Sequence, residues 1–142
     1  MSALRKAWLW ARLALNEAIY WFVGTTPESH YATAAYLWHE LGRHRRSIAH
    51  CKRYLAHTHS DPMVALCAYG HTELDEWTEA VAAYRSLTEP LKDPLNAMAL
   101  AYAELQLGNA AEARAIVATV EAVRGQLSDI EVDALDYVQS VL

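Results

Sequence analysis

Residues 93–120, DPLNAMALAYAELQLGNAAEARAIVATV, decide the fold because they predict two helices joined by a tight turn. Asp93 suits the cap of a first helix, and Pro94 suits its first turn, where the missing N–H costs nothing. Strong helix formers follow up to Leu107. Gly108 and Asn109 then tolerate the left-handed conformation that ends a helix. The second helix starts at Ala110, with small residues that allow close approach of the two backbones.

The same pattern recurs along the chain every 33 residues. Small residues recur in both helices, an apolar residue precedes each turn, and a turn residue follows it. The small residues of the first helix are Ala35, Ala68, Ala101 and Ala134, and the apolar residue before the turn is Leu41, Leu74 or Leu107. The turn residue is Gly42, Asp75 or Gly108. In the second helix the small residues are Ser47, Ala80 and Ala113, and the apolar residues near its end are Tyr54, Leu87 and Val120. Self-similarity at such an interval is typical of stacked helix pairs.

This pattern, with Asp-Pro at 61–62 and 93–94, resembles the tetratricopeptide repeat (TPR) family. The resemblance implies an all-α, right-handed α-solenoid of about three TPR-like helix pairs, with capping helices at both ends. An amphipathic helix would occupy residues 1–24, and the repeat domain 25–142. The repeats would span about 28–59, 61–91 and 93–124, and a final helix 128–141 would continue the register through Ala134. Thr26 suits the cap of the first repeat, and Ser128 with Glu131 has the spacing of a capping box for the final helix. The large aromatic that the family has early in each first helix is Tyr31 in the first pair, but Val64 and Ala97 stand there in the next two.

Composition and charge narrow the class of protein. The 142 residues are 54% hydrophobic with few Gly and Pro, which indicates a folded helical chain. Residues 1–60 hold eight Lys/Arg and three acids, a net charge of +5, whereas residues 61–142 hold four Lys/Arg and fourteen acids, a net charge of −10. The acidic part argues against nucleic acid as the main partner. Cys51 and Cys67 fall in apolar rows, which favours buried free thiols in a reducing, cytoplasmic compartment over a disulfide or a reactive thiol.

Residues 1–24 predict an amphipathic helix with two alternative roles. One apolar stripe follows a 4-3-4-3-4 spacing through Leu4, Trp8, Ala11, Leu15, Ala18 and Phe22, and Trp10, Ile19 and Trp21 widen it. Arg12, Asn16 and Glu17 interrupt the run of apolar residues along the sequence, so neither a membrane span nor a signal peptide is predicted. The helix either caps the first helix pair or docks on a membrane surface or an apolar partner through Leu4, Trp8, Trp10, Leu15, Trp21 and Phe22.

Tyrosines also recur at the interval of the repeat, at positions 36, 69 and 102. In the TPR family the first helices line a concave groove, and the resemblance places these tyrosines in it. Phenol rings offer rigid contact area with a polar tip, which favours capture of a peptide or helix. The alternative is that the rings pack helix against helix. The neighbouring positions predicted to share the groove are His39, Glu40, Thr72, Glu73, Met98, Leu105 and Gln106.

Cations gather in and beside the second helix of the first pair, at Arg43, Arg45, Arg46, Lys52 and Arg53. One interpretation is a solvated outer face. The other is a docking patch for an acidic partner or for anionic lipid headgroups.

Catalytic and metal-binding patterns are not recognisable. His57, His59 and Asp61 lie close in sequence, but no Cys pair or His-Glu-x-x-His helix supports a metal site. We therefore expect no enzyme activity, no metal and no cofactor. The lysines and asparagines with which some TPR domains hold chaperone tails are absent here, where the matching places are Ala32, Tyr36, Leu66, Leu95 and Ala99.

Two functional hypotheses follow. The first is a non-enzymatic protein–protein interaction module, a cytoplasmic adaptor that binds a partner peptide or helix in the groove. The second is a small accessory subunit of a membrane-associated complex, peripheral to the membrane and docked through residues 1–23. Self-association through the opposite charges of the two halves is a third kind of contact open to the chain.

Overall fold

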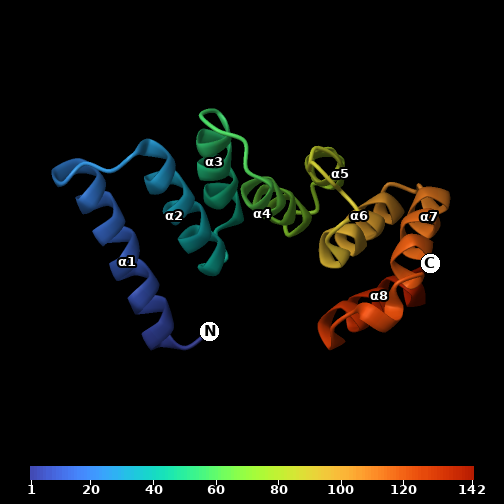
Figure 1. The fold of residues 1–142 in the computed structure, drawn as a ribbon. Helices are drawn as coiled ribbons and strands as arrows, with labels where there is room; N and C mark the ends of the chain where they lie inside the picture. Colours follow the sequence, from blue (N-terminus) through green and yellow to red (C-terminus); the bar gives the residue numbers. More distant parts are fainter. The chain divides into compact units, whose positions relative to one another are not determined.

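Every regular element of the protein is helical, as the computed structural model shows for all 142 residues (Figure 1). Eight α-helices follow one another without a strand, which confirms the predicted all-α class and the expected number of helices. They are α1 (Ala3–Phe22), α2 (Pro27–Glu40), α3 (His44–Leu55), α4 (Asp61–Thr72), α5 (Trp77–Arg85), α6 (Pro94–Gln106), α7 (Ala110–Glu121) and α8 (Asp129–Val141), with a short 3₁₀ turn η1 (Arg124–Gln126) before α8. The chain forms two compact units, residues 1–70 and 71–142.

The predicted caps set the starts of three helices. The Asp93 side chain accepts a hydrogen bond from the Asn96 N–H at 2.8 Å, with Pro94 in the first turn of α6. Thr26 caps α2 in the same way. Ser128 and Glu131 form the predicted capping box of α8. Each cap satisfies N–H groups that a helix start otherwise leaves without partners.

The three hairpin turns are built alike. Gly42, Asp75 and Gly108 all have positive φ, at 68°, 57° and 82°. The N–H after each of them bonds back over the turn, from Arg43 to Trp38 O, from Glu76 to His71 O and from Asn109 to Glu104 O, each at 2.9 Å. This six-to-one bond defines a Schellman motif. The second helices accordingly start at positions 44, 77 and 110, which keeps the interval of the sequence repeat.

In the unit of residues 1–70, α2 lies between α1 and α3. Leu9 and Leu13 of α1 pack with Ala34 and Leu37 of α2 in a buried cluster. On the α3 side, the buried Ser47 hydroxyl donates to the carbonyl of Ala35 at 2.9 Å. The predicted small residues thus lie where two helices meet.

The face of α1 that packs is not the predicted stripe. Leu4, Trp8, Leu15 and Phe22 are all exposed, whereas the inner side of α1 carries Leu9, Leu13 and the half-buried Asn16 and Tyr20. Asn16 donates to the His30 carbonyl at 3.2 Å, and the Tyr20 ring stacks on His30 at 4.2 Å between centroids. Residues Leu9, Leu13, Asn16 and Tyr20 have the same helical spacing as the stripe, so spacing alone did not distinguish the two sides.

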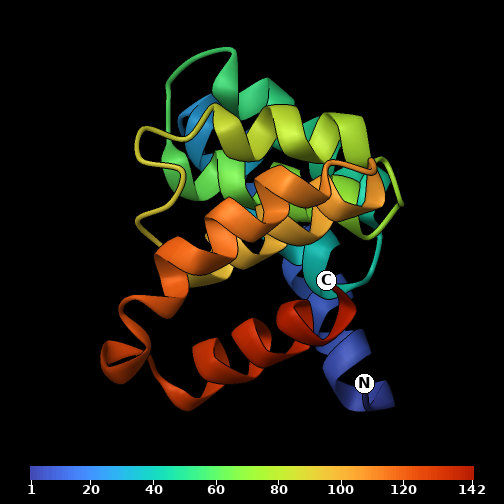
Figure 2. The same cartoon turned by 90° about the vertical axis from the view of Figure 1, so that its right-hand side faces the viewer.

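In the unit of residues 71–142, α6 contacts α5, α7 and α8. Ala101 and Ala113 have no exposed surface, and Leu100, Ile116 and Val120 fill the core beside them. Figure 2 shows the loop with η1 turning the chain back so that α8 runs beside α6 and α7. The repeat register is not kept in α8: Leu135 is fully buried while Ala134 is only half-buried. The prediction that Ala134 continues the row is therefore wrong.

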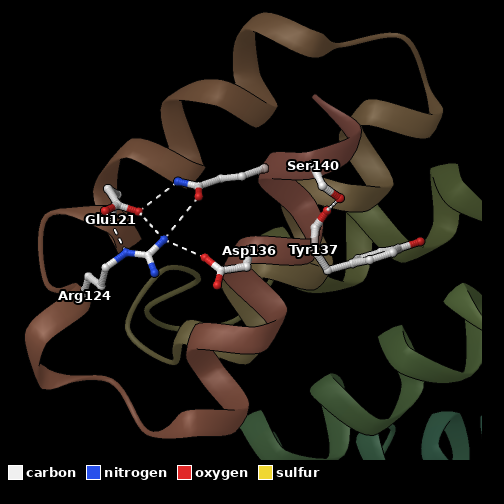
Figure 3. A network of polar contacts seen from close by, with 6 residues as sticks. Glu121, Arg124, Asp136, Tyr137 and Ser140 are labelled. Atoms are coloured by element: carbon white, nitrogen blue, oxygen red, sulfur yellow. Dashed lines mark hydrogen bonds and ion pairs between the residues drawn. The ribbon is translucent and has the colours of Figure 1, made fainter.

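A polar network ties α8 to the end of α7 (Figure 3). Arg124 donates to Glu121 at 2.8 Å and to Asp136 at 2.7 Å, and the Gln139 amide donates to Glu121 at 2.8 Å. The hydrogen bonds to Glu121 and then to Asp136 are the largest causes that raise the pKa of Arg124. The hydrogen bond from Arg124 is the largest cause that lowers the pKa of Glu121. The network is exposed, so its contribution to stability is modest and pH-dependent.

The close approach of α4 to α3 gives a first test of the packing. A Cβ atom added at Gly70 would lie 2.8 Å from Cγ1 of the buried Ile48. Ala in a helix interior is ordinarily better than Gly by about 1 kcal/mol, but overpacking costs about 1–3 kcal/mol. Gly70→Ala should therefore lower the free energy of unfolding in a urea titration. Gly125→Ala is the control, because nothing lies within 4 Å of its added Cβ. A Gly70→Ala protein as stable as the Gly125→Ala protein would contradict this packing.

The Arg124 network gives a second test, through pH. Because the folded-state pKa of Glu121 is lowered, its pairing stabilises the protein above the ordinary glutamate pKa of 4.5, and that stabilisation fades as the pH falls through the lowered value. Arg124→Gln should lower the urea midpoint near neutral pH, and the deficit should shrink on acidification. Arg53→Gln, which removes an exposed cation from α3, is the control. A deficit that stays constant with pH would show that the ion pairs do not hold α8.

Candidate functional site

The recurring tyrosines lie at the surface rather than in the core. Tyr36 and Tyr69 are 45% and 42% exposed, and Tyr102 is half-buried. Each follows a fully buried alanine, at positions 35, 68 and 101. A helix rotates by about 100° per residue, so an alanine turned into the core leaves the next side chain near the surface. Core filling is therefore not the role of Tyr36 or Tyr69.

Tyr36 lines a shallow cleft between α1 and α2 with a volume of about 360 Å³. Its other lining residues are Arg5, Trp8, Leu9, Arg12, Thr33, Leu37 and Glu40. The guanidinium of Arg5 pairs with the Glu40 carboxylate across the cleft. The predicted groove residue Glu40 is thus already held by an intramolecular ion pair, and the cleft wall is aromatic and cationic on its α1 side.

Tyr69 lies against two histidine rings. The His39 ring is edge-on at 5.0 Å between centroids and the His44 ring at 6.4 Å. His39 is half-buried, whereas the phenol of Tyr69 is exposed. Aromatic pairs in such edge-to-face geometry add to the energy of burial.

Tyr102 belongs to a cluster in the second unit. Trp77 is edge-on at 5.7 Å, and the Tyr137 ring of α8 lies at 5.9 Å. A hydrogen bond with Tyr137 is the largest cause of a raised pKa at Tyr102, followed by burial. The phenol is therefore neutral at physiological pH. Trp77 is the first residue of α5, so the start of this helix contacts the Tyr102 ring.

The other positions predicted to share the groove lie partly at the surface and partly in the core. Glu73 and Gln106 are exposed, and Thr72 and Leu105 are half-buried. Met98 is only 2% exposed, which corrects its prediction as a groove residue. A long, flexible apolar side chain gains more from filling the core than from lying on the surface.

A second candidate surface is the outer side of α1. All six predicted docking residues are exposed there, with Leu4 and Phe22 at 86% and 88%. The guanidinium of Arg12 lies over the Trp8 ring, 4.7 Å from its centroid. Because the inner side of α1 packs on α2, the helix both covers α2 and leaves an apolar face in solvent.

The predicted basic patch is also at the surface, since Arg43, Arg45, Arg46, Lys52 and Arg53 are all exposed. Arg46 lies over the Trp38 ring at 4.6 Å, and Trp38 meets Trp10 of α1 edge-on at 5.3 Å. This aromatic contact links the start of α3 to α1. At the other end of α3, burial is the largest cause that lowers the pKa of His50, so that imidazole is neutral near pH 7.

The remaining chemistry-bearing residues have structural partners. No group of three His, Cys, Asp or Glu side chains is arranged to hold a metal ion. His59 bonds to Asp61 at 2.8 Å, and the buried His71 bonds to Glu76 at 2.7 Å. The buried Glu104 accepts from Arg85 at 2.9 Å and from Asn109 at 2.7 Å. These contacts fix hairpin turns and helix pairs.

Comparisons of the chain with protein-family models, curated proteins and solved structures found no match. Among the eight helices, none combines the length and the apolar character needed to cross a bilayer.

Both cysteines are buried free thiols, as their apolar rows predicted. Burial raises the pKa of Cys51 to about 12 and raises that of Cys67. Because the thiolate is the reactive form, neither side chain should react with a thiol reagent at neutral pH in the folded protein, and both should react in denaturant. Mass spectrometry after alkylation measures this. Rapid labelling of the folded chain would show that the helices around Cys51 open readily.

Proposed function

We propose that the protein is a non-enzymatic interaction module, a right-handed TPR-type α-solenoid that binds a peptide or helix of a partner protein. The observation that carries this function is the recurrence, once in each helix pair and in constant register, of one Schellman turn together with one surface-accessible tyrosine. Repeated hairpins that present the same side chain in each repeat are how repeat proteins build an extended binding surface.

The chemistry of the tyrosine position suits a protein ligand. Tyr36, Tyr69 and Tyr102 each lie against other rings or beside an aromatic cleft wall, which limits their rotation. Preordered aromatic side chains lose little entropy on binding and dominate many interfaces. Their hydroxyl groups can exchange hydrogen bonds with a backbone, and the rings can cover apolar side chains.

Charge favours a basic segment over the acidic part of the chain, whereas the cleft of Tyr36 is lined by Arg5 and Arg12. Residues 61–142 carry a net charge of −10, and Glu73 is exposed in the turn that follows α4. Complementary charge raises the rate of encounter and disfavours acidic competitors. The occupant is therefore a partner segment with apolar or aromatic side chains and Lys or Arg between them.

A second function, that of an accessory subunit peripheral to a membrane, is favoured by one separate observation. That observation is the exposed outer face of α1. The two functions are compatible, because the tyrosines other than Tyr36 are remote in sequence from α1.

The interaction function is tested with peptides selected from a random display library against the full-length chain. The triple variant Tyr36→Ala, Tyr69→Ala, Tyr102→Ala should weaken the selected peptides by at least about tenfold in calorimetry, since truncated hot-spot residues each cost more than about 1 kcal/mol.

The matched control replaces the same three tyrosines with Phe, which keeps the rings and should keep most of the affinity. Circular dichroism must remain helical in both variants. Peptides that bind the Ala variant as tightly as the parent would refute the assignment of the surface. A library that yields no binder at all would refute the peptide-binding function itself.

A further inference from the structure

The outer face of α1 is apolar across half of the helix circumference. The inner side is held on α2 from Leu9 to Tyr20. At about 100° per residue, the opposite half of the wheel carries no charged or polar side chain. Its members are Ala3, Leu4, Ala7, Trp8, Trp10, Ala11, Ala14, Leu15, Ala18, Ile19, Trp21 and Phe22. The side that faces solvent is thus more apolar than the side that packs, which contains Asn16.

The exposed area is large and continuous. Leu4, Trp21 and Phe22 are 86%, 73% and 88% exposed. From Leu4 to Phe22 the face extends about 27 Å along the helix. Val23 continues it past the end of the helix at 77% exposure. Contiguous apolar patches of this kind mark a binding surface rather than ordinary scatter of surface apolar residues.

The charges of α1 lie along the borders of this face. Arg5 and Arg12 follow one border, and Lys6 and Glu17 follow the other. Arg12 lies over Trp8, and Glu17 lies 3.5 Å from His30. Cations beside an apolar face can reach outward to anionic headgroups while the face itself enters the apolar layer.

More cations collect near the first half of α1. The contacts from Arg46 to Trp38 and from Trp38 to Trp10 bring the start of α3 to α1. Arg43 and Arg45 are exposed in the same turn. Residues 1–60 carry a net charge of +5, against −10 for the rest of the chain. The apolar face and the excess positive charge therefore belong to the same unit.

We propose that α1 binds the anionic surface of a lipid bilayer, with its outer face in the headgroup and acyl boundary. This inference rests on the second function proposed above, that of a subunit peripheral to a membrane, and names anionic lipid as its contact; it does not depend on the peptide-binding function. Because α2 holds the inner side of α1 along its length, the helix presents its apolar face sideways and lies parallel to the membrane plane. Trp8, Trp10 and Trp21 occupy the interfacial depth that tryptophan favours.

A lipid surface fits the charge pattern better than a second copy of the chain. A two-fold axis through the middle of α1 would oppose the same border of both copies, with Arg12 near Arg12. Like charges would then face each other at the edge of the contact. Anionic lipid instead attracts Lys6 and Arg12, at roughly 1 kcal/mol per cation near the surface, whereas the charge of Arg5 is already paired with Glu40.

The test is flotation of the full-length protein with vesicles of phosphatidylcholine alone or with phosphatidylserine added. We expect the protein to float with the anionic vesicles, with a blue shift of tryptophan fluorescence, and to bind the neutral vesicles much more weakly. Lys6→Gln and Arg12→Gln should each weaken binding to anionic vesicles by about fivefold, and added salt should act in the same direction.

Matched variants distinguish the effect of disrupting the apolar face of α1 from the effect of adding negative charge elsewhere on the surface. Leu15→Glu with Phe22→Glu should abolish flotation, because two carboxylates would enter the apolar layer. Ile130→Glu with Val141→Glu adds the same charge at exposed apolar positions of α8 and should leave flotation unchanged. Circular dichroism checks that all variants stay helical.

Three results would overturn the inference. The first is a protein that floats with neither vesicle, and the second is equal flotation of both double variants. The third is a parent protein that sediments as a dimer and does not bind vesicles, together with a Leu15→Glu, Phe22→Glu variant that sediments as a monomer. That result would assign the face to a second copy of the chain. None of these results bears on the peptide-binding surface, which the tyrosine variants test separately.

Discussion

One left-handed residue per helix pair sets the geometry on which the rest of the structure depends. Gly42, Asp75 and Gly108 each reverse the chain with positive φ, and the N–H of the next residue bonds back to the first helix at 2.9 Å. The bond satisfies a carbonyl at the end of the helix and fixes the direction in which the second helix leaves. Gly takes this conformation without cost, and Asp tolerates it better than most residues. The hairpin angle is therefore set by local backbone chemistry.

The turn then determines which positions must be small. With the second helices starting at 44, 77 and 110, Ser47, Ala80 and Ala113 all have no exposed surface, and neither do Ala35, Ala68 and Ala101. In the first hairpin the Ser47 hydroxyl bonds to the Ala35 carbonyl, which requires close backbones. Because the alanine must pack in the core, the tyrosine that follows it lies toward the surface in each helix pair.

Sequence reasoning predicted the features that depend on local chemistry. The caps at Asp93 and Ser128, the turn residues and the number of helices follow from backbone hydrogen bonding within a few residues. The features that failed depend on packing partners distant in sequence. Met98 was assigned to the surface but is buried, and Leu135 rather than Ala134 forms the core of α8. Helical spacing shows which residues share a face and does not show which face another helix will cover.

For the same reason the sequence did not show which side of α1 packs on α2. The outer side, which stays exposed, is therefore the one whose apolar residues need a separate explanation. The Leu4 stripe and the Leu9 side have equal helical spacing, and the structure buries the second, which includes an asparagine. Leu9, Leu13 and the contacts of Asn16 and Tyr20 with His30 hold the inner side of α1 on α2. The outer Leu4, Leu15 and Phe22, unlike Trp10 with its contact to Trp38, therefore add little to the folding of the unit, and they cost solubility while they remain in water. Their presence beside Arg5, Lys6 and Arg12 is accounted for by a surface that the helix meets after folding, and the border cations indicate that this surface is anionic.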